Sequence, residues 1–119
     1  MDKLQTISGI ASAREVAKVD LSEFGIDFPD GLYIKKLSAL EMTRLLKMWD
    51  ESAALEDIQK YVITAAVVEP NGRRLFDDPE TDGKTIINEW PCDLVIGLMM
   101  QIYTYSGIIK DKPEQPEKN

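Results

Sequence analysis

A helix start around residue 38 constrains the fold more than any other feature of this sequence. Residues 38–41, Ser-Ala-Leu-Glu, form a capping box, in which the serine hydroxyl covers a free backbone amide and the glutamate reaches back to the serine amide. Leu37 and Met42 stand at the two positions of a hydrophobic staple. Apolar residues then recur at helical spacing, at Met42, Leu45, Leu46 and Trp49. The sequence therefore predicts an amphipathic helix that begins after Ser38.

Two further segments have helical periodicity. Between Ala54 and Ala66, the predicted buried face consists of Leu55, Ile58, Val62 and Ala65. A last helix is predicted between Pro91, which suits a first helical position, and Gly107, which suits a helix stop. Its predicted buried stripe is Leu94, Val95, Leu98, Met99 and Ile102.

Strand signals are few and short. Leu32–Leu37 is rich in strand formers and predicts a half-buried edge strand, with Val16–Leu21 as its antiparallel partner. Val67–Phe76 predicts a chain reversal around Asn71-Gly72. The expected fold class is mainly α with a minor β element (α+β), a small single-domain helical protein with a short N-terminal strand or hairpin.

The length of 119 residues suits one domain. We expect a single helical domain over residues 1–109, in which 1–30 form an irregular or flexible arm, followed by a disordered charged tail over 110–119. No apolar run approaches the ~18 residues that a membrane helix needs, and the first residues lack the order of a signal peptide. The chain is therefore expected to be soluble and cytoplasmic.

The composition excludes several kinds of chemistry. The chain contains no histidine and a single cysteine, Cys92, which removes histidine-based catalysis, histidine-ligated metals and thiolate zinc clusters. A formal net charge of −7 disfavours nucleic acid, since no basic patch exceeds two adjacent residues. We expect a protein that is not an enzyme, holds no cofactor and binds neither nucleic acid nor a membrane.

An acidic window over residues 78–89 has the spacing of an EF-hand calcium loop. Its first, third, fifth, sixth and twelfth positions are filled by Asp78, Glu80, Asp82, Gly83 and Glu89. Thr85 stands where an apolar residue is usual, and Asn71-Gly72 interrupts the helix that should precede such a loop. We therefore predict a solvated acidic loop over Asp77–Gly83, a short helix over Thr85–Glu89, and no metal site. Calcium at Asp78, Glu80, Asp82 and Glu89 remains the weaker alternative.

The last helix is apolar nearly all round. Met99 continues the predicted buried stripe, whereas Met100 falls with Ile96 and Tyr103 about 100° further round the helix. A single small core covers one such stripe, so the second is expected to meet a partner or another copy of the chain. Trp49, at a helix end, is a further candidate. The predicted partner-binding residues are Trp49, Ile96, Met100 and Tyr103.

The order of these segments resembles the tail assembly chaperones of long-tailed bacteriophages. The shared features are a strand entering Leu37-Ser38 and an acid, a centre of Val-acid-x-x-Gly-x-x-Leu-Phe-acid type at residues 68–77, and a last apolar helix with a small-residue stop. The resemblance covers roughly Val19 to Ile109. Gly97 inside the last helix and the acids of 78–82 depart from the family pattern.

The resemblance implies a non-enzymatic protein of phage or prophage origin in the host cytoplasm. Such chaperones bind the tape measure protein, keep it soluble, promote tail-tube assembly and are absent from the mature virion. In the family, a frameshifted longer form contacts the tail tube protein, and self-association into homo-oligomers is common. The residues alone leave two alternatives open, a non-enzymatic adaptor of unknown client and a weak calcium-binding module.

Overall fold

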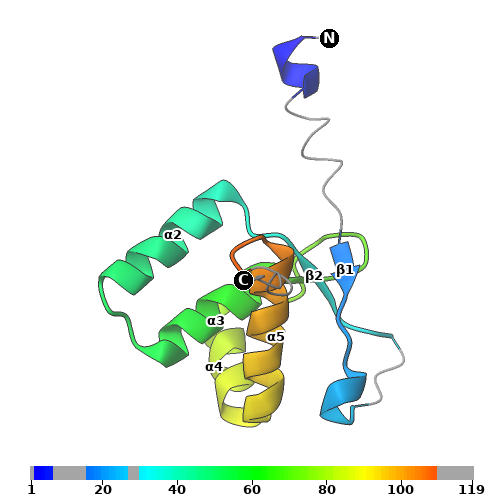
Figure 1. The fold of residues 1–119 in the computed structure, drawn as a ribbon, viewed down its shortest axis with the longest axis vertical. Coiled ribbons are helices and arrows are strands. Elements are labelled where there is room, and N and C mark those ends of the chain that lie inside the picture. Colours follow the sequence, from blue (N-terminus) through cyan, green and yellow to red (C-terminus); the bar gives the residue numbers. More distant parts are fainter. Residues whose placement is uncertain (1, 7–15, 27–29, 110–119) are drawn as a thin grey trace, which may run out of the picture.

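The computed structural model describes residues 2–6, 16–26 and 30–109. Helices account for 58% of it, beside one small antiparallel sheet, which confirms the predicted α+β class. After a helical turn at residues 3–6, the elements follow in the order β1 (Val16–Lys18), a 3-10 helix η1 (Ser22–Phe24), β2 (Tyr33–Lys35), α2 (Ala39–Asp50), α3 (Leu55–Ala66), β3 (Val67–Val68), α4 (Pro79–Glu89) and α5 (Cys92–Tyr105) (Figure 1).

Part of the arm predicted for residues 1–30 has regular structure, because β1 and η1 fall within it. Residues 7–15 and 27–29 of that segment lie outside the described residues, as does the tail predicted for 110–119. In the parts of the chain that the structure describes, none of the helices combines the length and apolarity that crossing a bilayer requires.

The sheet has the strand order β1-β2-β3, with both pairings antiparallel. Ala17 lies opposite Ile34, so the predicted N-terminal hairpin is confirmed. The prediction of an edge strand at Leu32–Leu37 is wrong, because β2 is the central strand. Val67 and Val68, which leave α3 directly, pair with its second edge. Both Ile34 and Lys35 are consequently buried, and the alternation expected of a half-buried edge strand is lost.

The predicted reversal after β3 is confirmed. Val68 and Arg74 form an antiparallel bridge, and the amide of Glu69 donates to the carbonyl of Arg73 at 2.8 Å. Gly72 supplies a positive φ of 90° and donates from its amide to the Glu69 carbonyl. The turn therefore closes on the backbone conformation for which Asn71-Gly72 is suited.

Helix α3 forms the centre of the core, packed against α2, α4 and α5. Its predicted face is buried except for Leu55, which lies exposed in the first turn. All five residues of the predicted α5 stripe are buried. The larger members of the core are Leu45, Ile58, Val62, Ile63, Ile86, Val95, Leu98, Met99 and Ile102.

The loop predicted over Asp77–Gly83 is wrong, because helix α4 begins at Pro79. Asp78 caps this helix by accepting hydrogen bonds from the amides of Glu80 and Thr81, at 3.1 and 3.4 Å. Pro79 lacks only an amide that a first helical residue leaves unpaired. Gly83 makes no calcium-loop turn. It lies buried against α3, where an added Cβ would be 3.0 Å from Cβ of Lys60.

The glycine inside α5 also has a packing role. A Cβ on Gly97 would lie within 2.3 Å of Cζ of Phe24 in η1, so the missing side chain accommodates the phenyl ring. Further along α5, the amide of Leu37 donates to Oγ of Ser106 at 2.9 Å. These contacts join the N-terminal segment and the β2–α2 connection to the two halves of α5.

Candidate protein-binding surface

Helix α5 presents an apolar side that the core does not cover. Ile96, Met100 and Tyr103 are spaced at i, i+4 and i+7, which places them on one side of the helix. Ile96 is 53% exposed and Met100 47% exposed, while Tyr103 is half-buried. The buried stripe of α5 faces α3 and leaves this second apolar side outside, as the sequence predicts.

Trp49 connects the same surface to α2. Its ring lies edge-on to that of Tyr103, with centroids 6.0 Å apart and planes at 73°, a favourable aromatic geometry. Trp49 is 39% exposed despite this contact. The four predicted residues therefore form one connected surface, here called the apolar strip: Trp49, Tyr103, Met100 and Ile96.

Leu46 extends the strip along α2, one turn before Trp49. The sequence places Leu46 in the apolar stripe of that helix, and the structure leaves it 51% exposed. Only part of this stripe reaches the core: Leu45 is fully buried, and Met42 is partly buried against the core. The signal available in the sequence was the width of the stripe: adjacent Leu45 and Leu46 point about 100° apart, and one contact buries only one of them.

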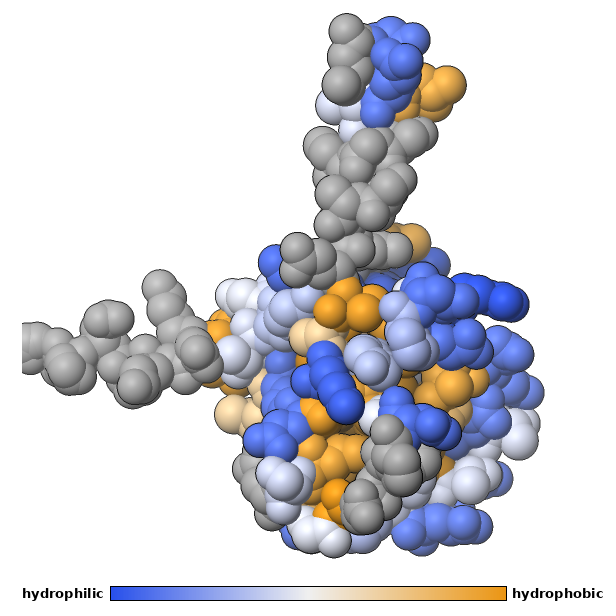
Figure 2. Space-filling view, turned by 90° about the vertical axis from the view of Figure 1, so that its right-hand side faces the viewer, coloured by the Kyte–Doolittle hydropathy of each residue, from blue (hydrophilic) through white to orange (hydrophobic). Residues whose placement is uncertain are grey.

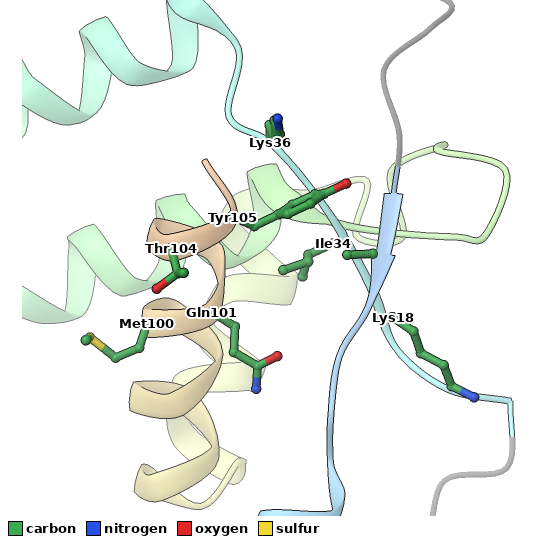
Figure 3. A pocket seen from close by; sticks show the side chains of 8 residues that line it. Lys18, Ile34, Lys36, Met100, Gln101, Thr104 and Tyr105 are labelled. Carbon is green, nitrogen blue, oxygen red and sulfur yellow. The ribbon is translucent and has the colours of Figure 1, made fainter. Parts of the chain in front are cut away.

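A groove of about 510 Å³ lies beside the strip, between α5 and the β1–β2 hairpin. Gln101 and Tyr105 project from α5 toward the strands, with Lys18 and Lys36 at the two ends (Figure 3). Met100 borders both the groove and the strip. Seen from the hairpin side, apolar surface forms patches separated by hydrophilic side chains (Figure 2).

The ionisable groups of this surface offer little chemistry. Burial raises the pKa of the Tyr103 hydroxyl above its ordinary value, so it stays protonated at neutral pH. Lys36 places its ammonium 5.5 Å from the ring centroid of Tyr105, a cation–π contact that holds this lysine at the groove edge. The surface is suited to covering another apolar surface rather than to transferring a proton or a group.

The calcium-loop hypothesis does not fit the geometry of α4. Hydrogen bonds from the backbone and side chain of Thr81, and from the backbone of Glu80, lower the pKa of Asp78. This carboxylate therefore serves as a helix cap. Glu89 lies eleven positions further along this helix, roughly 16 Å along the axis. Among the residues that the structure describes, no three acidic or cysteine side chains are grouped to hold a metal ion.

Comparison of the chain with protein-family models, with curated proteins and with solved structures gives no match.

Proposed function

We propose that this chain is a tail assembly chaperone of a long-tailed bacteriophage, which binds the tape measure protein and keeps it soluble during tail-tube assembly. The observation that carries the proposal is the apolar strip. Large apolar and aromatic side chains from α2 and α5 meet on one surface and stay partly exposed to solvent, which is unusual unless such a surface binds something. The order of the segments between Val19 and Ile109, which resembles that of tail assembly chaperones, is the reason for proposing this family.

The aromatic pair gives the strip an anchor of the kind found in protein interfaces. Tryptophan and tyrosine dominate binding energy because they bury a large rigid surface at low entropic cost. The net charge of −7 helps to keep the client soluble, since mutual repulsion keeps complexes of chain and client dispersed. An aggregation-prone client is held by the strip, while the charged remainder of the surface faces water.

The finer features of the family are part of the same proposal. The chain acts in the host cytoplasm, leaves before the virion is complete, and forms homo-oligomers through the apolar strip. A longer form made by frameshifting contacts the tail tube protein. Apolar association of this kind holds or strengthens with added salt, whereas charge-driven association weakens.

Co-expression with the tape measure protein of the same phage tests the proposal. The wild-type chain is expected to keep this client in the soluble fraction, and Met100→Asp is expected to lose most of that effect. Asn88→Asp, which adds the same charge at an exposed position of α4, is the matched control and should behave as wild type. A folded wild-type chain that leaves the client insoluble would instead favour an adaptor with another client.

Oligomer mass, measured by sedimentation at low and high salt, tests self-association separately. We expect wild type and Asn88→Asp to assemble at both salt concentrations and Met100→Asp to sediment as a smaller species. A wild-type monomer at high protein concentration would contradict this part of the proposal.

A further inference from the structure

A second cavity, on a part of the molecule that shares no residue with the apolar strip, has a different chemistry. It has a volume of about 400 Å³ and lies where β2, α2, α3 and the turn after β3 meet. Polar and charged side chains from four segments converge there. The main lining side chains are those of Lys35, Glu41, Arg44, Tyr61 and Arg74, and we call this cavity the arginine pocket.

One acid and one base of the arginine pocket neutralise each other. Nζ of Lys35 lies 2.5 Å from Oε1 of Glu41, and both side chains are largely buried. The same oxygen accepts from the amide of Ser38 at 2.8 Å, within the capping box. Burial favours the neutral acid, but the hydrogen bonds from Lys35 and Ser38 outweigh it, so the pKa of Glu41 is lowered and this carboxyl stays ionised. This pair is internally satisfied.

The two arginines have no such partner. In the described parts of the chain, the ion pairs are Lys35–Glu41, Lys47–Glu51 and Lys60–Asp57, and neither arginine takes part in them. Arg44 comes from α2 and Arg74 from the turn, and both are exposed at the cavity wall. Because the opposite charges of Lys35 and Glu41 cancel, the pocket retains the two positive charges of the arginines, in a chain whose net charge is −7.

Tyr61 places a hydroxyl beside these charges. Burial raises its pKa above the ordinary value, and Glu41 adds to that effect, so the hydroxyl stays protonated and donates to the carbonyl of Glu41 at 3.4 Å. The positive charges of Arg44 and Arg74 lower the pKa of Tyr61, as does a hydrogen bond with Arg44. Two guanidinium groups therefore offer hydrogen-bond donors around one small volume, while the phenol hydroxyl is already bonded to the backbone of α2.

We propose that the arginine pocket binds a carboxylate of a protein partner, between Arg44 and Arg74. Guanidinium groups match the planar geometry of a carboxylate and bind it through paired N–H donors. A doubly charged phosphate fits less well, since the ionised Glu41 belongs to the wall and the whole chain repels anions at long range. The carboxylate belongs to an Asp or Glu side chain or to a chain terminus.

Titration of the full chain with short peptides tests this assignment, with the arginine side-chain N–H resonances as the readout. The probes are Ac-Ala-Glu-Ala-NH2, which carries a side-chain carboxylate, Ac-Ala-Ala-Ala-OH, which carries a terminal one, and the neutral Ac-Ala-Gln-Ala-NH2. We expect saturable shifts of Arg44 and Arg74 with at least one charged peptide and none with the neutral peptide. The stronger of the two charged probes identifies the source of the carboxylate.

The neighbouring arginine provides a matched control. Arg44→Gln and Arg74→Gln should each weaken binding about tenfold, the loss expected for one charge-assisted hydrogen-bonded contact. Arg73→Gln removes the same charge one residue away, outside the cavity lining, and should leave binding unchanged. Equal weakening by all three variants, equal shifts with the neutral peptide, or saturable binding of inorganic phosphate alone would each overturn the proposal.

Discussion

Helices α2 and α3 have the same length and similar sequence periodicity, but the molecule uses them differently. Each contains 12 residues and an apolar stripe at helical spacing. In α3 the buried residues are Ile58, Val62, Ile63, Thr64, Ala65 and Ala66, whereas α2 buries only Leu45. Helix α3 lies among α2, α4 and α5, while α2 stands to one side of the molecule (Figure 1). Periodicity thus predicts which face of a helix is apolar, and not whether its own chain covers that face.

Helix α3 therefore has a structural role in the core, whereas α2 contributes side chains to an exposed surface. The apolar side chains of α3 make the core on which α4 and α5 rest. Those of α2 end at Trp49, which reaches Tyr103 of α5 and completes the apolar strip. Substitutions at core positions should therefore mainly lower stability, whereas substitutions in the apolar strip should mainly weaken binding.

The largest loss of stability is expected for Leu45→Ala. Leu45 is 0% exposed and is the one fully buried residue of α2, so its removal leaves a cavity between α2 and α3. A Leu→Ala change at such a site costs about 2–5 kcal/mol. Chemical denaturation monitored by circular dichroism measures it. A loss no larger than that of an exposed alanine substitution would show that α2 does not rest on α3 through this residue.

Glu41→Gln should come next, at roughly 1.5–3 kcal/mol, because it leaves Lys35 charged and without its ion-pair partner. The pKa of Glu41 is lowered from 4.5, so its contribution is present above that pH and is lost as the pH falls through the folded-state value. The stability difference between wild type and Glu41→Gln should therefore shrink between pH 7 and about pH 3. A difference that stays constant over this range would contradict the assignment.

Gly83→Leu tests how closely α4 packs against α3, the helix at the centre of the core. The new side chain would meet Cβ, Cγ and Cδ of Lys60 at the α3–α4 contact. Overpacking of this kind costs about 1–3 kcal/mol, even though leucine favours the helix more than glycine does. Thermal unfolding measures the loss. An unchanged or raised melting temperature would mean that α4 does not approach α3 closely at this point.

The smallest effect on stability is expected for Leu46→Ala. Leu46 directly follows Leu45, the residue whose truncation is expected to cost most. Leu46 is 51% exposed, so its truncation should change the free energy of unfolding by less than about 0.5 kcal/mol in the isolated chain. The same variant should weaken self-association measured by sedimentation. A large loss of stability in the dilute monomer would show that the strip is covered by the chain itself.

Features that depend on nearby residues were predictable from the sequence. The capping box at Ser38, the turn at Asn71-Gly72 and the buried stripe of α5 each depend on side chains a few residues apart, and each is confirmed. The start of α4 was missed, although Asp78-Pro79 is a helix-start signal, because the same acids match a calcium-loop spacing.

Features that depend on distant packing were not predictable. The central position of β2 follows from its pairing with β3 some thirty residues later, and the exposure of Leu46 follows from how α2 sits on α3. For the candidate surface, the residues of α5 followed from helix geometry. The contact of Trp49 with Tyr103 and the convergence of Arg44 with Arg74 required the tertiary structure.

Site-specific photo-crosslinking to the tape measure protein tests most directly whether the apolar strip is a binding surface. A photoreactive phenylalanine analogue would replace Leu46, Ile96 or Met100 in turn, with Asn88 of α4 as the exposed control position. Adducts with the client at the three strip positions, and none at position 88, are the expected result. Adducts of equal yield at all four positions, or at position 88 alone, would contradict the assignment of binding to this surface.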